Sequence, residues 1–305
     1  MCKYDIIGDI HGHYDLLVKM LKELGYTKTS VGYFCEGRKV IFTGDYINRG
    51  PEIRKTIHLI REMVENGNAL AILGNHELNA ILYFTLPKLG KSYVKEVAHL
   101  KLPLIKTIEE YAKYPDELKD TIQWFRHLPI YLDLGSIRVV HGGWSDAHVE
   151  TVQKFMNGEA KIKKSFLKEY IDDNKLNQAV NELVKGVEMR LPKDLILKDN
   201  KGISRRVFRI KWWEQADGKT FKEMSFGNRF KLPAYTIPKE ITPSIEEYTN
   251  NLPPVFFGHY CLEKHDLIVK SNLCCVDRCV TRTQTLSAYR WEGETMLKQE
   301  NLVHI

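Results

Sequence analysis

The stretch GDIHG at residues 8–12 decides the fold of this chain, together with GDYINRG at 44–50, GNHE at 74–77, HGG at 141–143 and a late GH at 258–259. Each segment directly follows an apolar run rich in β-branched residues, namely YDII, KVIFT, LAIL, IRVV and PVFF. Such a run is typical of a strand that delivers Asp, Asn or His into a glycine-rich loop. Because strand ends line one edge of an open α/β sheet and ligands bind in that crevice, we expect these side chains to converge.

The converging side chains have the composition of a two-metal site. Carboxylates and imidazoles bind Mn²⁺, Fe and Zn²⁺, and a set without thiolates disfavours a purely structural zinc site. In a two-metal site about 3.5–4 Å across, a bridging hydroxide becomes a nucleophile at neutral pH and both ions clamp phosphoryl oxygens. Asp45 is central in the order of ligands and is expected to bridge the ions. The expected ligands are Asp9, His11, Asp45, Asn75, His141 and His259.

The spacing of the first two ligands suggests how they reach one ion. Asp9 and His11 are two residues apart. Alternate side chains of a strand lie on the same side, so both side chains are expected at the first metal.

Composition and charge narrow the class of protein. The 305 residues are 43% hydrophobic and 28% charged, and no apolar stretch is long enough to cross a membrane. The N-terminus lacks the features of a signal peptide, so we expect a cytoplasmic protein. A net charge of +6 suits phosphorylated or polyanionic substrates, but it is too small to indicate nucleic-acid binding by itself. Nucleic acid is therefore expected only as a substrate, and the pattern leaves the oligomeric state open.

Six cysteines are too few for a disulfide framework in a chain of this length. Thiols stay reduced in the cytosol, and Cys274, Cys275 and Cys279 lack the spacing of a zinc knuckle. We therefore expect these three residues to be small apolar residues of a strand.

The chain is expected to form a single domain over residues 1–305, with two inserts. Residues 1–80 alternate strands with amphipathic helices that end at Gly25 and Gly67. Residues from about 81 to 130 read as a helical insert, and the lysine-rich region from about 150 to 250 reads as a cap or recognition insert. The region after PPVFF is expected to be all strand, with TLSAYRW and TMLKQ pairing as a hairpin.

The five ordered motifs resemble those of the phosphoprotein phosphatase family of calcineurin-like metallophosphoesterases. The resemblance covers about 1–80, 130–145 and 255–295, and it implies an α/β (α+β) fold, a β-sandwich with flanking helices. It also implies a hydrolase with two divalent ions. We expect Mn²⁺ in this chain, with Fe or Zn²⁺ as alternatives. By resemblance, Asp9 and His11 hold the first metal, Asp45 bridges, and Asn75, His141 and His259 hold the second.

The resemblance also implies two catalytic groups outside the ligand set. His76 would protonate or hydrogen-bond the leaving oxygen, and Arg49 would grip phosphate oxygens, a role that suits the fork of a guanidinium. A second phosphate-binding arginine is expected between the last two histidine ligands. Arg205, Arg206 and Arg209 are its candidates.

Asn48 departs from the protein phosphatases, which carry Asp at this position. That Asp favours the protonated form of the catalytic histidine, whereas Asn48 offers only its carbonyl, so the His76 imidazolium is expected to be less favoured. A serine alkoxide leaves badly and needs that proton, while a nucleoside diphosphate needs it much less. Bacterial symmetrical diadenosine tetraphosphatases also lack this Asp and continue RGP, as residues 49–51 do here.

The sequence therefore predicts a phosphohydrolase resembling diadenosine tetraphosphatase, which uses metal-bound hydroxide to cleave a phosphoanhydride or a phosphomonoester. A serine/threonine protein phosphatase is the alternative, and a nucleic-acid-end or small-molecule phosphatase ranks below it. A non-enzymatic sensor would show degenerate ligands, and none of the six positions is degenerate. Taken singly, the Asp and Asn residues could be ordinary helix caps, and Asp277 is expected to be structural.

Overall fold

The computed structural model describes residues 3–192, 197–198, 204–226, 232, 235–242, 245–263 and 266–305, and the chain falls into two units. Unit 1 comprises Met1–Lys185 and Pro253–Ile305, and unit 2 comprises Gly186–Leu252. The region expected as a cap at about 150–250 is thus divided, because its first part forms helices that belong to unit 1.

The first sheet of unit 1 carries the three leading motifs. Its order is β16-β15-β1-β4-β5, with β1, β4 and β5 parallel and β15 antiparallel to β1. Its bounds are β1 Lys3–Ile7, β4 Arg38–Phe42, β5 Ala69–Ala71, β15 Ser287–Trp291 and β16 Leu302–His304. The helices α1 (Tyr14–Glu23) and α2 (Ile53–Glu65) connect the parallel strands, so the predicted alternation of strand and helix is confirmed. A small hairpin of β2 (Thr27–Thr29) and β3 (Gly32–Phe34) lies between α1 and β4.

The second sheet of unit 1 carries the two later motifs. Its order is β13-β14-β12-β7-β6, and β12 runs parallel to both of its neighbours. Its bounds are β6 Tyr131–Asp133, β7 Arg138–Val140, β12 Val255–Phe257, β13 Ile268–Lys270 and β14 Leu273–Cys275. Phe256 of this sheet packs against Tyr289 of the first sheet, with ring centroids 5.0 Å apart and both side chains buried. The apolar core between the sheets therefore confirms the β-sandwich with flanking helices.

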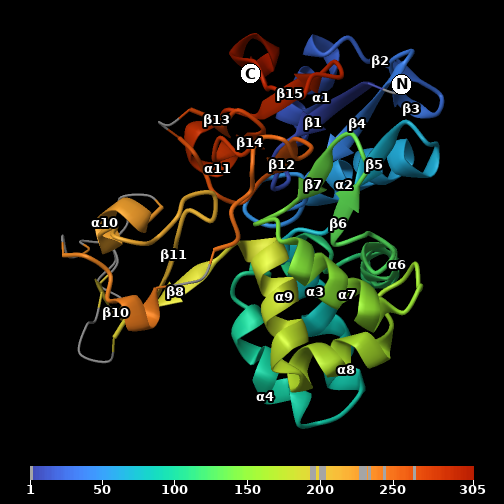
Figure 1. The fold of residues 1–305 in the computed structure, drawn as a ribbon. Coiled ribbons are helices and arrows are strands. Elements are labelled where there is room, and N and C mark those ends of the chain that lie inside the picture. Colours follow the sequence, from blue (N-terminus) through green and yellow to red (C-terminus); the bar gives the residue numbers. More distant parts are fainter. Residues whose placement is uncertain are drawn as a thin grey trace. The chain divides into compact units, whose positions relative to one another are not determined.

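A group of helices completes unit 1 and lies together at the bottom of Figure 1. The expected insert at about 81–130 is helical, and a second set of helices follows β7. These helices are α3 Asn75–Thr85, α4 Tyr93–Val97, α5 Ile105–Glu110, α6 Pro115–Phe125, α7 Asp146–Met156, α8 Lys164–Asp172 and α9 Asn174–Lys185. Gly142 and Gly143 donate backbone hydrogen bonds to carbonyls of α9, which ties this group to the HGG loop. None of the described helices has the length and apolar character needed to cross a membrane.

The C-terminal region corrects two expectations. Val280–Thr283 forms a short helix, α11, so the region is not all strand. The partner of β15 is Leu302–His304 rather than the predicted TMLKQ segment. Glu294 explains the difference, because its side chain accepts hydrogen bonds from Tyr289 Oη and from the backbone N–H of Glu292 and so holds the chain in a loop here.

Unit 2 has a small core of its own. Its strands are β8 Glu188–Arg190 paired with β11 Val207–Arg209, and β9 Leu197–Lys198 paired with β10 Ser204–Arg205, and its helix is α10 Phe221–Met224. Buried apolar side chains from these elements pack together, among them Met189, Phe208, Phe221 and Met224.

Candidate metal centre

Each of the five motifs begins where a strand ends. The strands β1, β4 and β5 end at Ile7, Phe42 and Ala71, and β7 and β12 end at Val140 and Phe257. The loops after these strands are bound to one another: the backbone N–H of His11 donates to the Asp45 carbonyl at 2.8 Å, and that of Gly258 donates to the His141 carbonyl at 3.0 Å. The structure thus brings the predicted ligand residues to one edge of the sandwich.

Two clusters of donor atoms share Asp45. One consists of His11, Asp45 and His76, and the other of Asp45, His141 and His259, with the donor atoms of each cluster within 4.8 Å of one another. Asn75 joins the second cluster, because its Oδ1 lies 3.2 Å from His141 Nε2. A carboxylate common to both clusters is what a bridging ligand requires.

The separations of the donor atoms fit the edges of a metal coordination sphere. Asp45 Oδ1 lies 3.3 Å from His141 Nε2, and Asp45 Oδ2 lies 3.6 Å from His11 Nε2. Ligands bonded at about 2.1 Å lie roughly 3.0–3.4 Å apart in octahedral or tetrahedral sites. These two separations therefore lie within a few tenths of an ångström of those between ligands of one divalent ion.

The histidines are oriented as metal ligands usually are. His11 Nδ1 donates to the Ile47 carbonyl at 3.0 Å, and His141 Nδ1 donates to the Thr43 carbonyl at 2.7 Å. In both rings Nε2 is therefore the atom left to bind a metal ion, and it faces Asp45. A backbone acceptor on the other ring nitrogen fixes the tautomer and the orientation of a ligating imidazole.

Asp9 contacts the loop that carries His259. Its carboxylate accepts the backbone N–H of His259 at 3.2 Å and lies 4.0 Å from His141 Nδ1. The sequence argument assumed that Asp9 and His11 are alternate residues of a strand. Both residues lie beyond the end of β1, so strand geometry does not determine the direction of their side chains. The left-handed backbone of His11, with φ of 47°, turns its side chain toward Asp45 instead.

Unusual backbone conformations concentrate at this centre. Among the described residues, nine other than glycine have positive φ, and five of them are His11, Asp45, Asn48, Arg49 and His259. Such conformations cost of order 1–3 kcal/mol each and persist where the surroundings impose them, which is typical of functional sites.

Glycine is needed where the loops touch. A Cβ on Gly258 would lie 2.3 Å from Asp9 Oδ1, and one on Gly74 would lie 2.3 Å from Asp45 Oδ1.

Glu77 holds the loop that presents Asp45. Its fully buried carboxylate accepts the backbone N–H groups of Asp45, Tyr46, Ile47 and Gly74 at 2.8, 2.9, 3.3 and 3.1 Å. Sequence reasoning quoted GNHE but assigned this residue no role. The signal was present, because a Glu three residues after a helix N-cap is the pattern of a capping box.

His76 is flanked by Asn48 and Arg49. Asn48 Nδ2 lies 2.6 Å from His76 Nδ1, and the hydroxyl of Thr107 donates to Asn48 Oδ1 at 2.6 Å. The sequence suggested that the Asn48 carbonyl orients His76, but Thr107 occupies that carbonyl, so the amide nitrogen faces the ring instead. Arg49 Nη1 and Nη2 lie 3.0 Å from Nε2 of His11 and of His76. Thr107 was missed, because it lies in the helical insert outside every motif.

Buried carboxylates crowd the centre. Burial lowers the pKa of His141, but the charges of Asp45 and Asp9 outweigh it and raise this pKa to about 10. Burial, together with the charges of Asp277 and Asp45, raises the pKa of Asp9 well above its usual value. Burial and Asp45 raise the pKa of Glu77 to about 7. Burial also lowers the pKa of His76 to about 4, so this ring carries no charge at neutral pH to balance the carboxylates. Divalent cations would favour the ionised form of these buried carboxylates, so the donor set fits the metal ions that the motifs imply.

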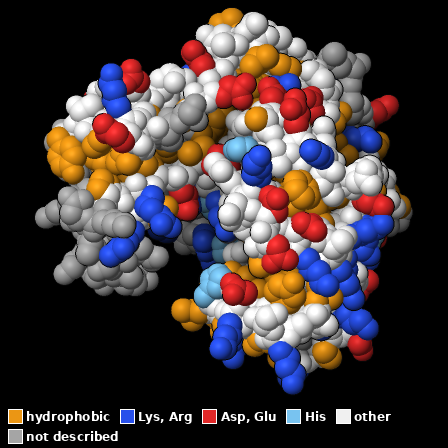
Figure 2. Space-filling model, turned by 60° about the horizontal axis from the view of Figure 1, so that its bottom comes forward, with side chains coloured by type: hydrophobic (Ala, Val, Ile, Leu, Met, Phe, Trp, Pro, Cys, Tyr) orange, Lys and Arg blue, Asp and Glu red, His pale blue; other side chains and the backbone are white. Residues whose placement is uncertain are grey.

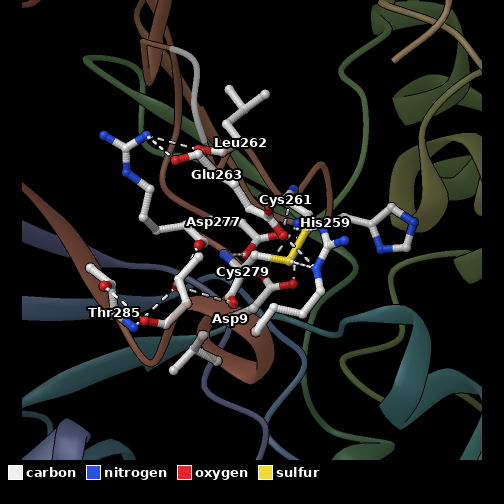
Figure 3. Close-up of a disulfide and its surroundings, with 12 residues drawn as sticks. Asp9, His259, Cys261, Leu262, Glu263, Asp277, Cys279 and Thr285 are labelled. Carbon is white, nitrogen blue, oxygen red and sulfur yellow. Dashed lines mark hydrogen bonds and ion pairs between the residues drawn. A yellow bond between two sulfur atoms is a disulfide. The ribbon is translucent and has the colours of Figure 1, made fainter. Parts of the chain in front are cut away.

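A disulfide lies beside the centre and corrects the reading of the cysteines. Cys261 and Cys279 are joined, whereas Cys274 and Cys275 are buried free thiols of strand β14, as expected. Figure 3 shows the disulfide with the Asp277 carboxylate beside it and Asp9 and His259 nearby. Asp277 accepts the backbone N–H groups of Cys261 and Cys279 at 2.7 Å each. Asp277 and the disulfide thus tie the loop that carries His259 to the loop after β14.

The candidates for a second arginine belong to unit 2. The side chain of Arg205 lies outside the described residues, Arg206 is exposed, and Arg209 is half-buried at the end of β11. The choice among them stays a prediction.

Fold and site together define a class of protein. The chain belongs to the calcineurin-like phosphoesterase family, whose sequence profile matches residues 3–261.

Among its relatives is the symmetrical bis(5'-nucleosyl)-tetraphosphatase of Wigglesworthia glossinidia brevipalpis, 27% identical over 306 residues that cover 96% of this chain and 97% of the relative. The asymmetrical bis(5'-nucleosyl)-tetraphosphatase PrpE of Geobacillus sp. (strain WCH70) is 34% identical over 149 residues, 46% of this chain. This match spans only 57% of the length of PrpE. The fold is shared with the solved structure of a cold-active protein-tyrosine phosphatase from a psychrophilic Shewanella species, with a TM-score of 0.51 at 15% identity. The superposition covers 96% of this chain and 79% of the phosphatase chain.

Replacing Glu77 by Gln tests its hold on the Asp45 loop. The amide NH₂ of Gln would face backbone N–H groups that now donate to a carboxylate, so we expect the free energy of unfolding to fall by about 2–3 kcal/mol. We also expect less Mn²⁺ bound per chain after dialysis. Urea unfolding and elemental analysis measure the two effects, with the exposed Glu109→Gln as matched control. A variant as stable and as metal-rich as the control would contradict this role.

Reducing the disulfide tests how much the link between Cys261 and Cys279 stabilises the protein. Cys261 and Cys279 are 18 residues apart, and a disulfide closing a loop of this length contributes about 3 kcal/mol to stability. We expect TCEP, or the double change Cys261→Ser and Cys279→Ser, to lower the free energy of unfolding in urea by about that amount. Cys35→Ser, which leaves the disulfide intact, is the control. Equal stability with and without TCEP would show that the bond contributes nothing.

Proposed function

We propose that this protein is a metal-dependent phosphohydrolase that cleaves a phosphoanhydride, with a dinucleoside polyphosphate as its substrate. The observation that carries the proposal is Asp45, whose carboxylate belongs to two donor clusters at once, with the Arg49 guanidinium beside them. A dinuclear centre next to an arginine fork matches the geometry of phosphoryl transfer. The names of the two tetraphosphatase relatives support this substrate class.

In this proposal the six predicted ligands divide into two sets. Asp9 and His11 would hold one ion, Asn75, His141 and His259 would hold the other, and Asp45 would contribute an oxygen to each. When bound, two divalent ions supply a water with a lowered pKa and positive charge for the phosphoryl oxygens. Mn²⁺ is the proposed ion, because oxygen and nitrogen donors without thiolates suit it.

Three side chains of this chain would act on the phosphate and the leaving group. Arg49 would bind two phosphoryl oxygens through its fork, because its Nη atoms already lie at His11 and His76 of the cluster that includes Asp45. His76 would donate a hydrogen bond to the leaving oxygen from Nε2. Asn48 would fix the ring from its other side, held in turn by Thr107.

The neutral Asn48 favours an anhydride over an ester. Water adds to phosphorus and the P–O bond to the leaving group breaks, so the leaving oxygen takes the electron pair. A nucleoside diphosphate stabilises that pair by itself, whereas a serine alkoxide needs a proton from His76. The amide NH₂ of Asn48 points at Nδ1 and offers no negative charge, which disfavours the imidazolium that an ester substrate would need.

The cytoplasmic location expected from the sequence also stays a prediction.

A substrate panel with Mn²⁺ tests the proposed function. We expect diadenosine tetraphosphate to be hydrolysed far faster than a phosphothreonine peptide or a 3′-phosphorylated oligonucleotide. Two ADP would indicate symmetrical cleavage, and AMP with ATP would indicate asymmetrical cleavage. EDTA and the Asp45→Asn variant should each abolish turnover, and added Mn²⁺ should restore it after EDTA. Faster hydrolysis of the peptide would make the protein a serine/threonine phosphatase and would refute the anhydride assignment.

Changing Asn48 to Asp tests the leaving-group argument separately. Asp at this position can accept both from Thr107 and from the His76 ring, so it favours the imidazolium. We expect kcat on a phosphoserine peptide to rise about tenfold, a small part of the factor of about 10²–10⁴ that general acid catalysis supplies, with little change on diadenosine tetraphosphate. The exposed Asn66→Asp is the control. No gain on the peptide with unchanged metal content would refute this account of Asn48.

A further inference from the structure

A cavity lies in the helical part of unit 1, away from the candidate metal centre. It has a volume of about 290 Å³ and is enclosed by the C-terminal end of α3, one face of α6 and the N-terminal residue of α8. Asn75 begins α3 and Thr85, which lines the cavity, ends it. Ten residues of helix at 1.5 Å each separate the two ends by about 15 Å. A group bound in this cavity therefore cannot reach the metal centre.

The polar lining of this cavity is cationic. Four basic side chains line it, and none of its described lining residues is acidic. They are Lys88, Lys119, Arg126 and Lys164. Two of the three acidic residues of α6, Glu117 and Asp120, pair with Arg54 and Arg61 of α2. Lys119 of α6 and Arg126, which directly follows the helix, line the cavity instead. Figure 2 shows Lys and Arg side chains bordering hydrophobic ones on the helical side.

Arg126 is the buried member of this set. Its side chain belongs to a residue only 6% exposed, and its guanidinium donates to two neutral acceptors, the Ile162 carbonyl at 2.8 Å and Gln123 Oε1 at 3.2 Å. None of the carboxylates that the structure describes forms an ion pair with it, and burial lowers its pKa with no acidic neighbour to raise it again. A buried charge without a counter-charge is unfavourable unless a ligand supplies one. An anion bound in the cavity would supply the missing counter-charge.

The three lysines form its rim. Lys88, Lys119 and Lys164 are exposed, and among the described residues none of them takes part in an ion pair. Lys164 is the first residue of α8, where the positive end of the helix dipole adds to its own charge. Three flexible ammonium groups above a fixed guanidinium suit a phosphate group, because both side-chain types donate to its oxygens.

The other lining residues indicate that the ligand is organic. Phe84, Pro115, Leu118 and Ile122 line the cavity with apolar surface beside the cations. Inorganic phosphate would leave this surface uncovered, whereas a planar base could lie against it. The volume is at the lower end of the range of about 300–1,000 Å³ for small-molecule sites, which suits one nucleotide rather than a dinucleotide or a peptide.

We propose that this cavity binds a nucleoside monophosphate, with the phosphate on Arg126 and the rim lysines and the base against Phe84 and its apolar neighbours. The proposal concerns binding at the far end of α3 and does not depend on the reaction proposed for the metal centre. The occupant would contact the last turn of the helix that begins with Asn75 and His76.

Calorimetric titration of the full chain with AMP, in EDTA and at 50 mM NaCl, tests the proposal. We expect saturable binding, and we expect the double change Lys119→Gln and Lys164→Gln to weaken it at least about tenfold, since two charge-assisted hydrogen bonds are lost. Both lysines are exposed, so this variant should fold, and Arg126→Gln should abolish binding altogether. The double change Lys22→Gln and Lys95→Gln alters the net charge equally outside the cavity and should leave the affinity unchanged.

Two further titrations test whether AMP binds in this cavity and whether the apolar wall contributes to binding. Arg49→Met should retain AMP binding, because the site lies at the other end of α3. Loss of binding in Arg49→Met, or equal affinity in the cavity and control variants, would place AMP elsewhere and overturn the proposal. Inorganic phosphate titrated in the same way should bind at least about tenfold more weakly than AMP. Phosphate binding as tightly as AMP would overturn the role of the apolar wall.

Discussion

The hydrogen bonds accepted by the Glu77 carboxylate are the constraint on which the rest of the metal centre depends. A single buried carboxylate accepts four backbone N–H groups, three from the loop that carries Asp45 and one from the N-cap of α3. It therefore fixes the loop after β4 to the start of the helix that carries Asn75 and His76. The left-handed backbone conformation of Asp45 is unfavourable by itself, and these hydrogen bonds hold it in place. Asp45 then contributes one oxygen to each cluster of histidines.

Charge is distributed unevenly along α3. At its N-terminal end the carboxylates of Asp9, Asp45 and Glu77 are buried together, and the raised pKa values of Asp9 and Glu77 report the repulsion and desolvation that cations would relieve. At its C-terminal end a buried guanidinium lies among lysines with no carboxylate of the described residues paired to it. The two ends therefore gather side chains of opposite charge. One helix thus connects a site suited to cations with a site suited to an anion.

The predictions that succeeded rest on local patterns. An apolar β-branched run followed by a glycine-rich loop marks a strand end, so the five strands and the edge where Asp9, Asp45 and His141 meet could be expected from residue order. The wrong predictions concern pairing at a distance. Cys261 and Cys279 are separated by 18 residues, and only the return of the chain after β14 brings their sulfurs together. The strand partner of β15 was misplaced for the same reason, because Glu294 holds the intervening segment as a loop.

By itself, the sequence determined which side chains carry the chemistry, since donor type and glycine spacing are properties of the residue order. It could not determine how those side chains face one another. Thr107, from an insert without a motif, takes the Asn48 carbonyl and so decides that an N–H group faces His76. The cavity at Arg126 likewise exists only because α3, α6 and α8 pack together in space. Orientation and burial depend on contacts between segments far apart in the chain, and only the tertiary structure sets those contacts.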